Sequence, residues 1–573
     1  MTKLYAKHIV RISLTALCLT GFNQYVQAQN TYLNYGSDEY HLLDRLETNS
    51  GQLISEFSMA QKPVSRKDAV WFLSQVVRSV RTRGFQVSDI DKFNIDRAIS
   101  ISGEWYENAS GESGSIDSKR PVLKYFYKKQ ADLLQVHNDD FFLAVNPIIY
   151  AQAGYERNVG LKTTNTRGLE FRGRIADKIG FYTMLADNQE KIPTYAEDWV
   201  ARHRGQFPGE HYAVKNGNNY DLFLARGYVD FSMIRNHIGV TFGYDRNQMG
   251  YGIRSLAIAN SSAPATFLRL RSQWGRFSYE NLYTELVANN TILQNGDGLL
   301  PRKYASIHQL NFTPNHWLSV GIFESTVFAK KTGIPVEMLL PVIGLQSGLK
   351  QLTGNNNNNA WGFQFKALPI NGVQLYGQLY ADRLDFAEIG EGSWKNQYAV
   401  QLGLKYFNVA KVANLDGQIE LNVVRPFTYT AQNDSLTSYT HYNQPLAHPL
   451  GNNFAELIGL LRYQPMPRLT LTGKVILSKR GVDSNSTDNI GNGIFGLAAN
   501  RTAGEKGYPM FVGKKEKGLY GNLNIAYEIK PNIFFEAGGS YFKKNSADVA
   551  QPTAIYLYGG LRWNISRREY DIY

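Results

Sequence analysis

Apolar and polar residues alternate along most of this chain, from about residue 141 to residue 563. The alternation comes in segments of roughly ten residues, and very short links and long polar links join these segments in turn. In residues 166–175, apolar side chains take one face of an extended strand and charged side chains take the other. After residue 28, no stretch approaches the roughly 18 consecutive apolar residues that a transmembrane helix requires. The pattern predicts an all-β transmembrane barrel.

The segments predict about 18 antiparallel strands, with tight links such as residues 275–276 and 313–315. An even number of strands places both chain ends on one side, which is the periplasm in bacterial outer-membrane barrels. The last strand is expected to close against the first. Long connections fall on the opposite side, at residues 188–218, 247–264, 327–359, 425–452, 479–518 and 545–551.

The first 28 residues have the features of a secretory signal peptide. Lys3, Lys7 and Arg11 supply the positive region, residues 12–22 the apolar core, and Ala28 ends a small-residue cleavage site. We therefore expect the protein in the outer membrane of a Gram-negative bacterium. The single cysteine, Cys18, lies within this segment, so we expect a mature chain without thiols or disulfides.

Residues 29–138 have a helical rather than an alternating pattern. Ser65 and Asp68 resemble a capping box, and apolar residues then recur at helical spacing to Val80. Shorter helices are predicted at residues 40–48 and 88–99. This predicts a small periplasmic helical domain before a barrel of residues 139–573. The domain could plug the periplasmic mouth, bind a periplasmic protein partner or assist assembly.

Composition agrees with a barrel. Aromatic residues make up 13% of the chain although its mean hydropathy is −0.34, which suits aromatic girdles around a wet lumen. The net charge of +12 falls to +9 without the three signal cations, since 12 − 3 = 9. This charge could favour anionic saccharides or lipid head groups, or could serve solubility. Outer-membrane lipid is an expected partner, and nothing points to nucleic acid.

Several short motifs resemble members of the outer-membrane capsule-assembly Wzi-like family. They lie at residues 165–168, 243–245, 250–256 (Gly-Tyr-Gly-Ile-Arg-Ser-Leu) and 442–451. The resemblance implies an eighteen-stranded barrel preceded by a periplasmic helical bundle. It also implies a lectin that binds capsular polysaccharide and tethers it to the cell surface, without catalysis.

Two other functions stay open: a porin-like channel for small solutes, and a structural component of a gliding-motility or secretion complex. The sequence has no nucleophile elbow, no His-Glu-x-x-His helix and no paired carboxylates, so we expect no enzyme and no cofactor. His441 and His448 lack a third ligand at metal spacing and are expected in a turn-rich loop. The asparagine run at residues 355–359 is interpreted as a loop tip without chemistry.

The long connection at residues 188–218 is rich in aromatic and basic residues. Aromatic rings stack on sugars, and arginine pairs with uronate carboxylates, so this loop could hold a charged glycan. A loop that folds inward to occlude the pore would need the same anchors. The candidate glycan-binding residues are Tyr195, Trp199, Arg202, Arg204 and His211, with Arg254 in the next long loop.

Charged residues on the inward faces of the strands form a second candidate group. They could order an acidic sugar or set pore selectivity, or they could form ion pairs that fill a closed barrel. Acids and bases are mixed, which favours the ion pairs. The predicted lumen charges are Glu170, Arg172, Arg174, Arg226, Asp230, Arg269 and Arg271.

Overall fold

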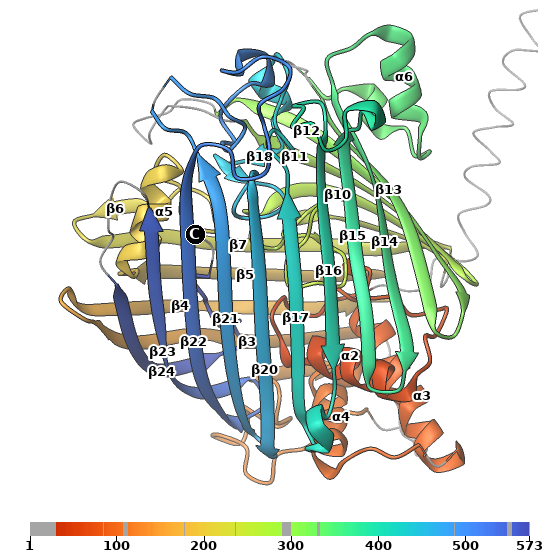
Figure 1. Ribbon diagram of the computed structural model, residues 1–573. Helices are drawn as coiled ribbons and strands as arrows, with labels where there is room; N and C mark the ends of the chain where they lie inside the picture. The colour runs from red at the N-terminus through yellow and green to blue at the C-terminus, as the bar shows by residue number, and fades with distance from the viewer. Residues whose placement is uncertain are drawn as a thin grey trace, which may run out of the picture.

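The computed structural model describes residues 30–83, 85–106, 113–138, 140–176, 178–234, 237–288, 300–328, 333–485, 487–546 and 553–571. Twenty strands of these residues belong to one closed sheet, in which β2 (Leu134–His137) and β6 (Val214–Asn216) extend the rims and the other eighteen form the barrel wall (Figure 1). The predicted barrel of 18 antiparallel strands is confirmed. The wall strands are β3 (Phe141–Glu156), β4 (Gly160–Ile175), β5 (Ile179–Glu190), β7 (Asn219–Ile234), β8 (Ile238–Asp245), β10 (Ala265–Trp274), β11 (Phe277–Val287), β12 (Arg302–Asn315), β13 (Leu318–Phe328), β14 (Asn358–Ile370), β15 (Val373–Arg383), β16 (Gln397–Tyr406), β17 (Leu415–Val424), β20 (Phe454–Met466), β21 (Leu469–Val482), β22 (Lys514–Lys530), β23 (Ile533–Ser546) and β24 (Ala554–Trp563).

The barrel closes where the last strand meets the first. β24 pairs antiparallel with β3, from Tyr556 opposite Glu156 to Trp563 opposite Ile149. Because closure leaves no unpaired edge, the backbone groups of the wall are satisfied within the sheet. The predicted closure is therefore confirmed.

Short links gather at one rim and most long loops at the other. The link between β10 and β11 is residues 275–276, as predicted, whereas the link between β12 and β13 is 316–317 rather than 313–315. The pairing of β12 with β13 resumes after an irregularity at Asn315 opposite Leu318, which lengthens β12. The predicted connection at residues 545–551 lies largely outside the described residues, as does the predicted signal peptide.

The two faces of the wall follow the alternation. On β23, for example, Phe535 is 58% exposed whereas the next residue, Glu536, is 5% exposed. Aromatic side chains such as Trp274, Phe277 and Trp317 are exposed near the short-link rim, as in an interfacial girdle. The outer face is thus apolar and the lumen polar.

Three helices precede the barrel, as predicted: α2 (Asp38–Ser50), α3 (Arg66–Arg83) and α4 (Asp89–Ile101). Ser88 and Asp91 form a capping box at the start of α4, and α2 ends at Gly51 in the left-handed conformation. Their apolar faces share one core that includes Leu46, Phe72 and Ile95. None of the described helices is long and apolar enough to span a bilayer.

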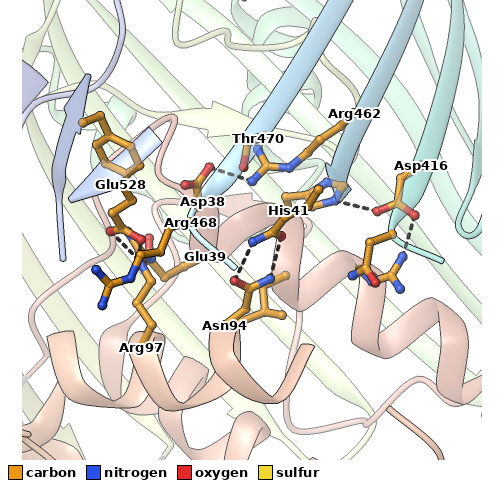
Figure 2. A pocket seen from close by; sticks show the side chains of 15 residues that line it. Asp38, Glu39, His41, Asn94, Arg97, Asp416, Arg462, Arg468, Thr470 and Glu528 are labelled. Carbon is orange, nitrogen blue, oxygen red and sulfur yellow. Dashed lines mark hydrogen bonds and ion pairs between the residues drawn. The ribbon is translucent and has the colours of Figure 1, made fainter. Parts of the chain in front are cut away.

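The helices occupy the short-link rim of the barrel (Figure 1). Arg97 of α4 donates to Glu528 at 2.6 Å, and Asp38 of α2 accepts from Arg462 at 2.9 Å (Figure 2). His41 bonds Asp416 of β17 at 2.9 Å (Figure 2). These contacts fix α2 and α4 to strands on the lumen side. Since β2, within the predicted helical domain, already pairs with β3, the division at residue 138 stays a prediction.

Candidate functional site

The loop between β5 and β7 folds into the lumen. Its helix α5 (Thr194–Arg202) places the ring of Tyr195 4.9 Å from that of Phe542, and its hydroxyl 3.2 Å from Ser540 on the inner face of β23. Trp199 is only 1% exposed and stacks on His203. Two of the predicted glycan-binding residues are therefore part of the barrel's core.

The other predicted residues of this loop also contact the protein itself. The Arg204 guanidinium lies 3.8 Å from the centre of the Phe495 ring, and Arg202 donates to the carbonyl of Asp198 at 3.4 Å. The His211 ring bonds the carbonyls of Tyr212 and Phe223, each at 2.8 Å. This arrangement matches a loop that folds inward to occlude the pore.

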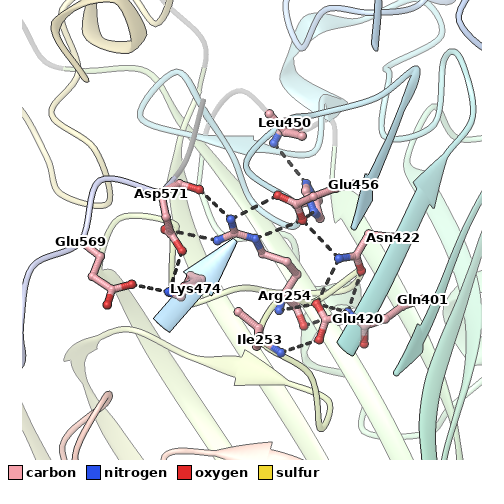
Figure 3. A network of polar contacts seen from close by, with 11 residues as sticks. Ile253, Arg254, Gln401, Glu420, Asn422, Leu450, Glu456, Lys474, Glu569 and Asp571 are labelled. Atoms are coloured by element: carbon pink, nitrogen blue, oxygen red, sulfur yellow. Dashed lines mark hydrogen bonds and ion pairs between the residues drawn. The ribbon is translucent and has the colours of Figure 1, made fainter. Parts of the chain in front are cut away.

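A second loop, residues 246–264, crosses the lumen and carries Arg254 to its centre (Figure 3). The guanidinium donates to Glu456 at 3.3 Å and to Asp571 at 3.5 Å, while the backbone N–H of Arg254 donates to Glu420 at 2.9 Å. Arg254 is almost completely buried. Its side chain and its backbone together hold three carboxylates from different parts of the chain. Its pKa stays well above the usual range because these carboxylates outweigh desolvation.

The C-terminal tail, residues 564–571, also lies inside the barrel, where it pairs with inward-facing residues of the wall. Lys474 of β21 lies 3.0 Å from Asp571 and also contacts Glu569 (Figure 3). Arg568 lies 3.2 Å from Glu190, which also accepts the hydroxyl of Tyr570. The tail therefore packs inside the wall beside the loop of residues 246–264. That loop also meets the N-terminal segment directly, because β9 (Gln248–Met249) pairs antiparallel with β1 (Gln61–Lys62).

The predicted lumen charges are engaged in the same manner. Arg172 donates to Asp132 at 3.1 Å and to Glu104, and Asp230 accepts the Tyr32 hydroxyl at 2.7 Å. The remaining contacts are Glu170 with Asn146 at 3.4 Å, Arg174 over Trp105 at 5.5 Å, Arg226 with Glu210 at 2.7 Å, Arg269 with Asn247, and Arg271 with Glu280 at 3.1 Å. This is the arrangement expected of charges that fill a closed barrel.

Two cavities of about 420 and 360 Å³ remain between these layers. Both are lined by Tyr35, Lys474 and Arg567, so the tail forms part of both walls.

One cleft opens at the long-loop rim, with a volume of about 270 Å³. We call it the rim cleft. It lies between the ends of β14, β15 and β16 and the loops at residues 333–357 and 425–453. Its lining is Lys350, Asn355, Asn356, Asn357, Asn358, Asp382, Arg383, Gln397, Thr430, Gln432, Asn433, Asp434, Thr437 and Ala498.

The rim cleft is dominated by side-chain amides, each of which offers donors and an acceptor. Asn356, Gln432 and Asn433 are exposed, as is Arg383, which donates to Gln432 at 3.0 Å. The Arg383 guanidinium also lies 5.0 Å from the centre of the buried Trp394 ring. The Arg501 guanidinium lies 4.4 Å from the same ring centre. The cleft thus presents positioned polar groups to solvent.

Sequence reasoning missed this cleft. The asparagine run predicts a loop tip without chemistry, whereas in the structure Asn355, Asn356, Asn357 and Asn358 all line the cleft. In the sequence, this asparagine run is the feature that could have indicated the cleft. The partners Arg383 and Gln432 come from other loops, and only the barrel brings them together.

The two loop histidines serve structure. His441 accepts the backbone N–H of Val287 at 3.0 Å and donates to the carbonyl of Pro264 at 2.9 Å. Burial and the nearby cations of Lys303 and Arg302 lower its pKa to about 3, although its bond to Pro264 opposes the shift. His448 lies 2.8 Å from Glu456. Both belong to a turn-rich loop, as predicted.

A closed barrel with an apolar outer wall, an aromatic girdle and a polar interior is an outer-membrane β-barrel. The family model described as capsule assembly protein Wzi matches residues 156–553. The chain therefore belongs to the Wzi capsule assembly family, and the protein lies in the outer membrane.

The solved structure of Wzi supports the fold. Wzi of Escherichia coli, described as a carbohydrate-binding β-barrel involved in group 1 capsule assembly, is 13% identical, with a TM-score of 0.55 over 94% of this chain and 100% of that one. OprD of Pseudomonas aeruginosa is 12% identical, with a TM-score of 0.41 over 74% of this chain and 93% of that one. Among curated protein sequences, none matches the chain.

Proposed function

We propose that this protein binds surface polysaccharide of the capsule type in the rim cleft and thereby holds it at the cell surface, without catalysis. The observation that carries the proposal is a contrast between two groups of polar side chains. The lumen charges already bond to the protein itself, whereas Asn356, Arg383, Gln432 and Asn433 of the rim cleft are exposed. The description of Escherichia coli Wzi as a carbohydrate-binding barrel supports the ligand class.

The groups of the cleft suit a glycan. Sugar hydroxyls both donate and accept, so they pair with the amides of Asn356, Gln432 and Asn433. The Arg383 guanidinium can pair with a uronate carboxylate through two parallel hydrogen bonds. We therefore expect a preference for an acidic polysaccharide.

The earlier candidates are less well placed for this role. Tyr195, Trp199 and Arg254 are buried, so a glycan could reach them only after α5 or the loop of residues 246–264 left the lumen. Their part in binding stays a prediction, as does a periplasmic protein partner bound through residues 29–138. The filled lumen gives no support to a porin-like channel, and we expect the purified barrel to conduct no steady current.

The proposal can be tested on cells. Deleting the gene is expected to release polysaccharide into the medium without lowering its total amount. A triple variant with Arg383→Ala, Gln432→Ala and Asn433→Ala is expected to behave like the deletion while the barrel accumulates normally. Lys543→Ala, which removes an exposed cation from β23 outside the cleft, should restore retention fully. Normal retention by the triple variant would overturn the assignment.

A further inference from the structure

A carboxylate faces outward on the barrel wall. Glu324 lies on the same face of β13 as Ile322, which is 41% exposed to the surroundings of the barrel. Charged side chains on this face normally meet lipid and destabilise the barrel. Glu324 is nevertheless completely buried.

The position of Glu324 is at membrane depth. It stands six residues along β13 from Leu318, which begins the strand at the short-link rim. With a rise of about 3.3 Å per residue and a strand tilt of about 40°, this places it about 15 Å above that rim. The apolar band of such barrels is about 25 Å tall, so something must separate this carboxylate from lipid.

The loop between β13 and β14 provides the cover. Its residues 333–353 contain the 3-10 helix η2 (Val336–Leu339) and the helix α6 (Leu345–Thr353), at the end of the barrel opposite α2–α4 (Figure 1). Glu324 accepts the backbone N–H of Gly344 at 2.6 Å and that of Ser347 at 2.8 Å. The start of α6 therefore stabilises the carboxylate with hydrogen-bond donors that the helix leaves unpaired.

Further bonds fix the same residues, which we call the wall cover, to the outer face. The Tyr279 hydroxyl donates to the carbonyl of Pro341 at 2.6 Å, and the Trp361 indole donates to Ser347 at 2.9 Å. Met338 packs with Tyr283, Tyr304 and Phe328 in one cluster. The wall cover thus lies against the barrel wall.

The surface that the wall cover presents is apolar. Val336 is 74% exposed and Leu352 is 84% exposed. Of the 21 residues from 333 to 353, only Glu337 and Lys350 carry charge. The exposed apolar side chains are Ile334, Val336, Leu339, Val342, Leu345 and Leu352. In water such a surface would be costly, whereas next to acyl chains it continues the apolar band.

We propose that the wall cover lies in the outer leaflet, where its exposed apolar side chains contact lipid acyl chains and its inner side shields Glu324. Short amphipathic segments that lie parallel to the membrane surface contact acyl chains in this way. Lys350 of α6 also lines the rim cleft, so lipid on one side would help to fix a wall of the cleft on the other. This inference is independent of the proposed polysaccharide binding.

Single-cysteine spin labelling tests the proposal. The only native cysteine is Cys18, within the predicted signal peptide, so Val336→Cys and Val342→Cys would each carry one nitroxide. The mature barrel is folded into phosphatidylcholine vesicles, folding is checked by heat-modifiable migration, and collision with oxygen is compared with collision with a water-soluble nickel chelate. Ile322→Cys on the lipid face and Asn433→Cys in the rim cleft are the matched controls.

Both wall-cover labels are expected to behave like the label at Ile322. Their ratio of oxygen collision to nickel-chelate collision should be at least several-fold higher than the ratio at Asn433. Labels that follow Asn433 would place the wall cover in water and overturn the proposal. Labels shielded from both reagents would show that protein, such as a second copy of the chain, covers the surface, which also overturns it.

Discussion

The lumen and the rim cleft contain the same kinds of polar side chain in opposite situations. Arg254 in the lumen is buried among Glu456, Asp571 and Glu420, whereas Arg383 in the rim cleft is exposed beside the neutral Gln432. Inside, the lumen charges described above are already committed to partners of the same chain. At the rim, the polar groups meet water, which a ligand can displace.

The energetic consequence differs accordingly. A buried charge that loses its partner is left desolvated without compensation. Removing one member of the lumen network should therefore lower the stability of the fold strongly. An exposed amide exchanges water for a sugar hydroxyl at little net cost, so it can bind and release. We therefore expect the lumen to provide stability and the rim cleft to provide recognition, and four changes test this division of roles.

The largest expected effect comes from Arg254→Ala. It removes the cation that pairs with the buried Glu456 and Asp571, although the backbone N–H that binds Glu420 remains. The free energy of unfolding should fall by about 3–5 kcal/mol. Urea unfolding in lipid vesicles measures this loss. The matched control, Arg383→Ala in the cleft, should change stability by less than about 0.5 kcal/mol. Equal effects of the two variants would contradict the division of roles.

Lowering the pH should decrease the free energy of unfolding because of His441. The folded protein keeps this ring neutral because its pKa is lowered from 6.5 to about 3, mainly by burial, so the unfolded chain binds the proton first. Stability is therefore complete above pH 6.5 and falls as the pH drops towards 3. By pH 5 the loss is about 2 kcal/mol for this residue. His441→Asn should flatten the pH dependence of unfolding by that amount, and an unchanged slope would refute the account.

A smaller effect is expected from Tyr32→Phe. Its hydroxyl donates to Asp230 at 2.7 Å, while Asp230 keeps the Thr241 hydroxyl, also at 2.7 Å. The loss of one hydrogen bond to a buried carboxylate should cost about 1–2 kcal/mol in unfolding experiments. Tyr125→Phe, at a side chain that is largely exposed, should cost almost nothing.

The smallest effect on stability is expected from the cleft. Arg383→Ala, Gln432→Ala and Asn433→Ala together should change the free energy of unfolding by less than about 1 kcal/mol, because all three side chains are exposed. A larger loss would mean that the cleft, like the lumen, is part of the packed structure.

The barrel was predictable because each strand carries its own evidence. Each side chain on the wall faces either lipid or the lumen and must be apolar or polar accordingly. The alternation at residues 166–175 therefore indicates which side chains face lipid and which face the lumen. Glu324 shows the limit of this rule. It is an acid on the outward face, and only the distant α6 explains why the barrel accepts it.

The site was harder to predict because loops carry no such period. Composition identified Tyr195 and Trp199 as anchors but could not tell whether the loop folds inward or outward. The rim cleft joins Asn356 to Gln432, which lie far apart in the sequence, so no local pattern marks it. Function at such a rim depends on the closed barrel that positions the loops.

The rim cleft is the proposed site of recognition. Calorimetric titration of the folded barrel with surface polysaccharide from the same strain measures binding at this site. The triple variant in Arg383, Gln432 and Asn433 should bind at least tenfold more weakly than the wild type, about 1.4 kcal/mol or more. Arg204→Ala, in the loop that folds into the lumen, should bind like the wild type. Full affinity in the triple variant, or loss of binding only in Arg204→Ala, would contradict this proposal.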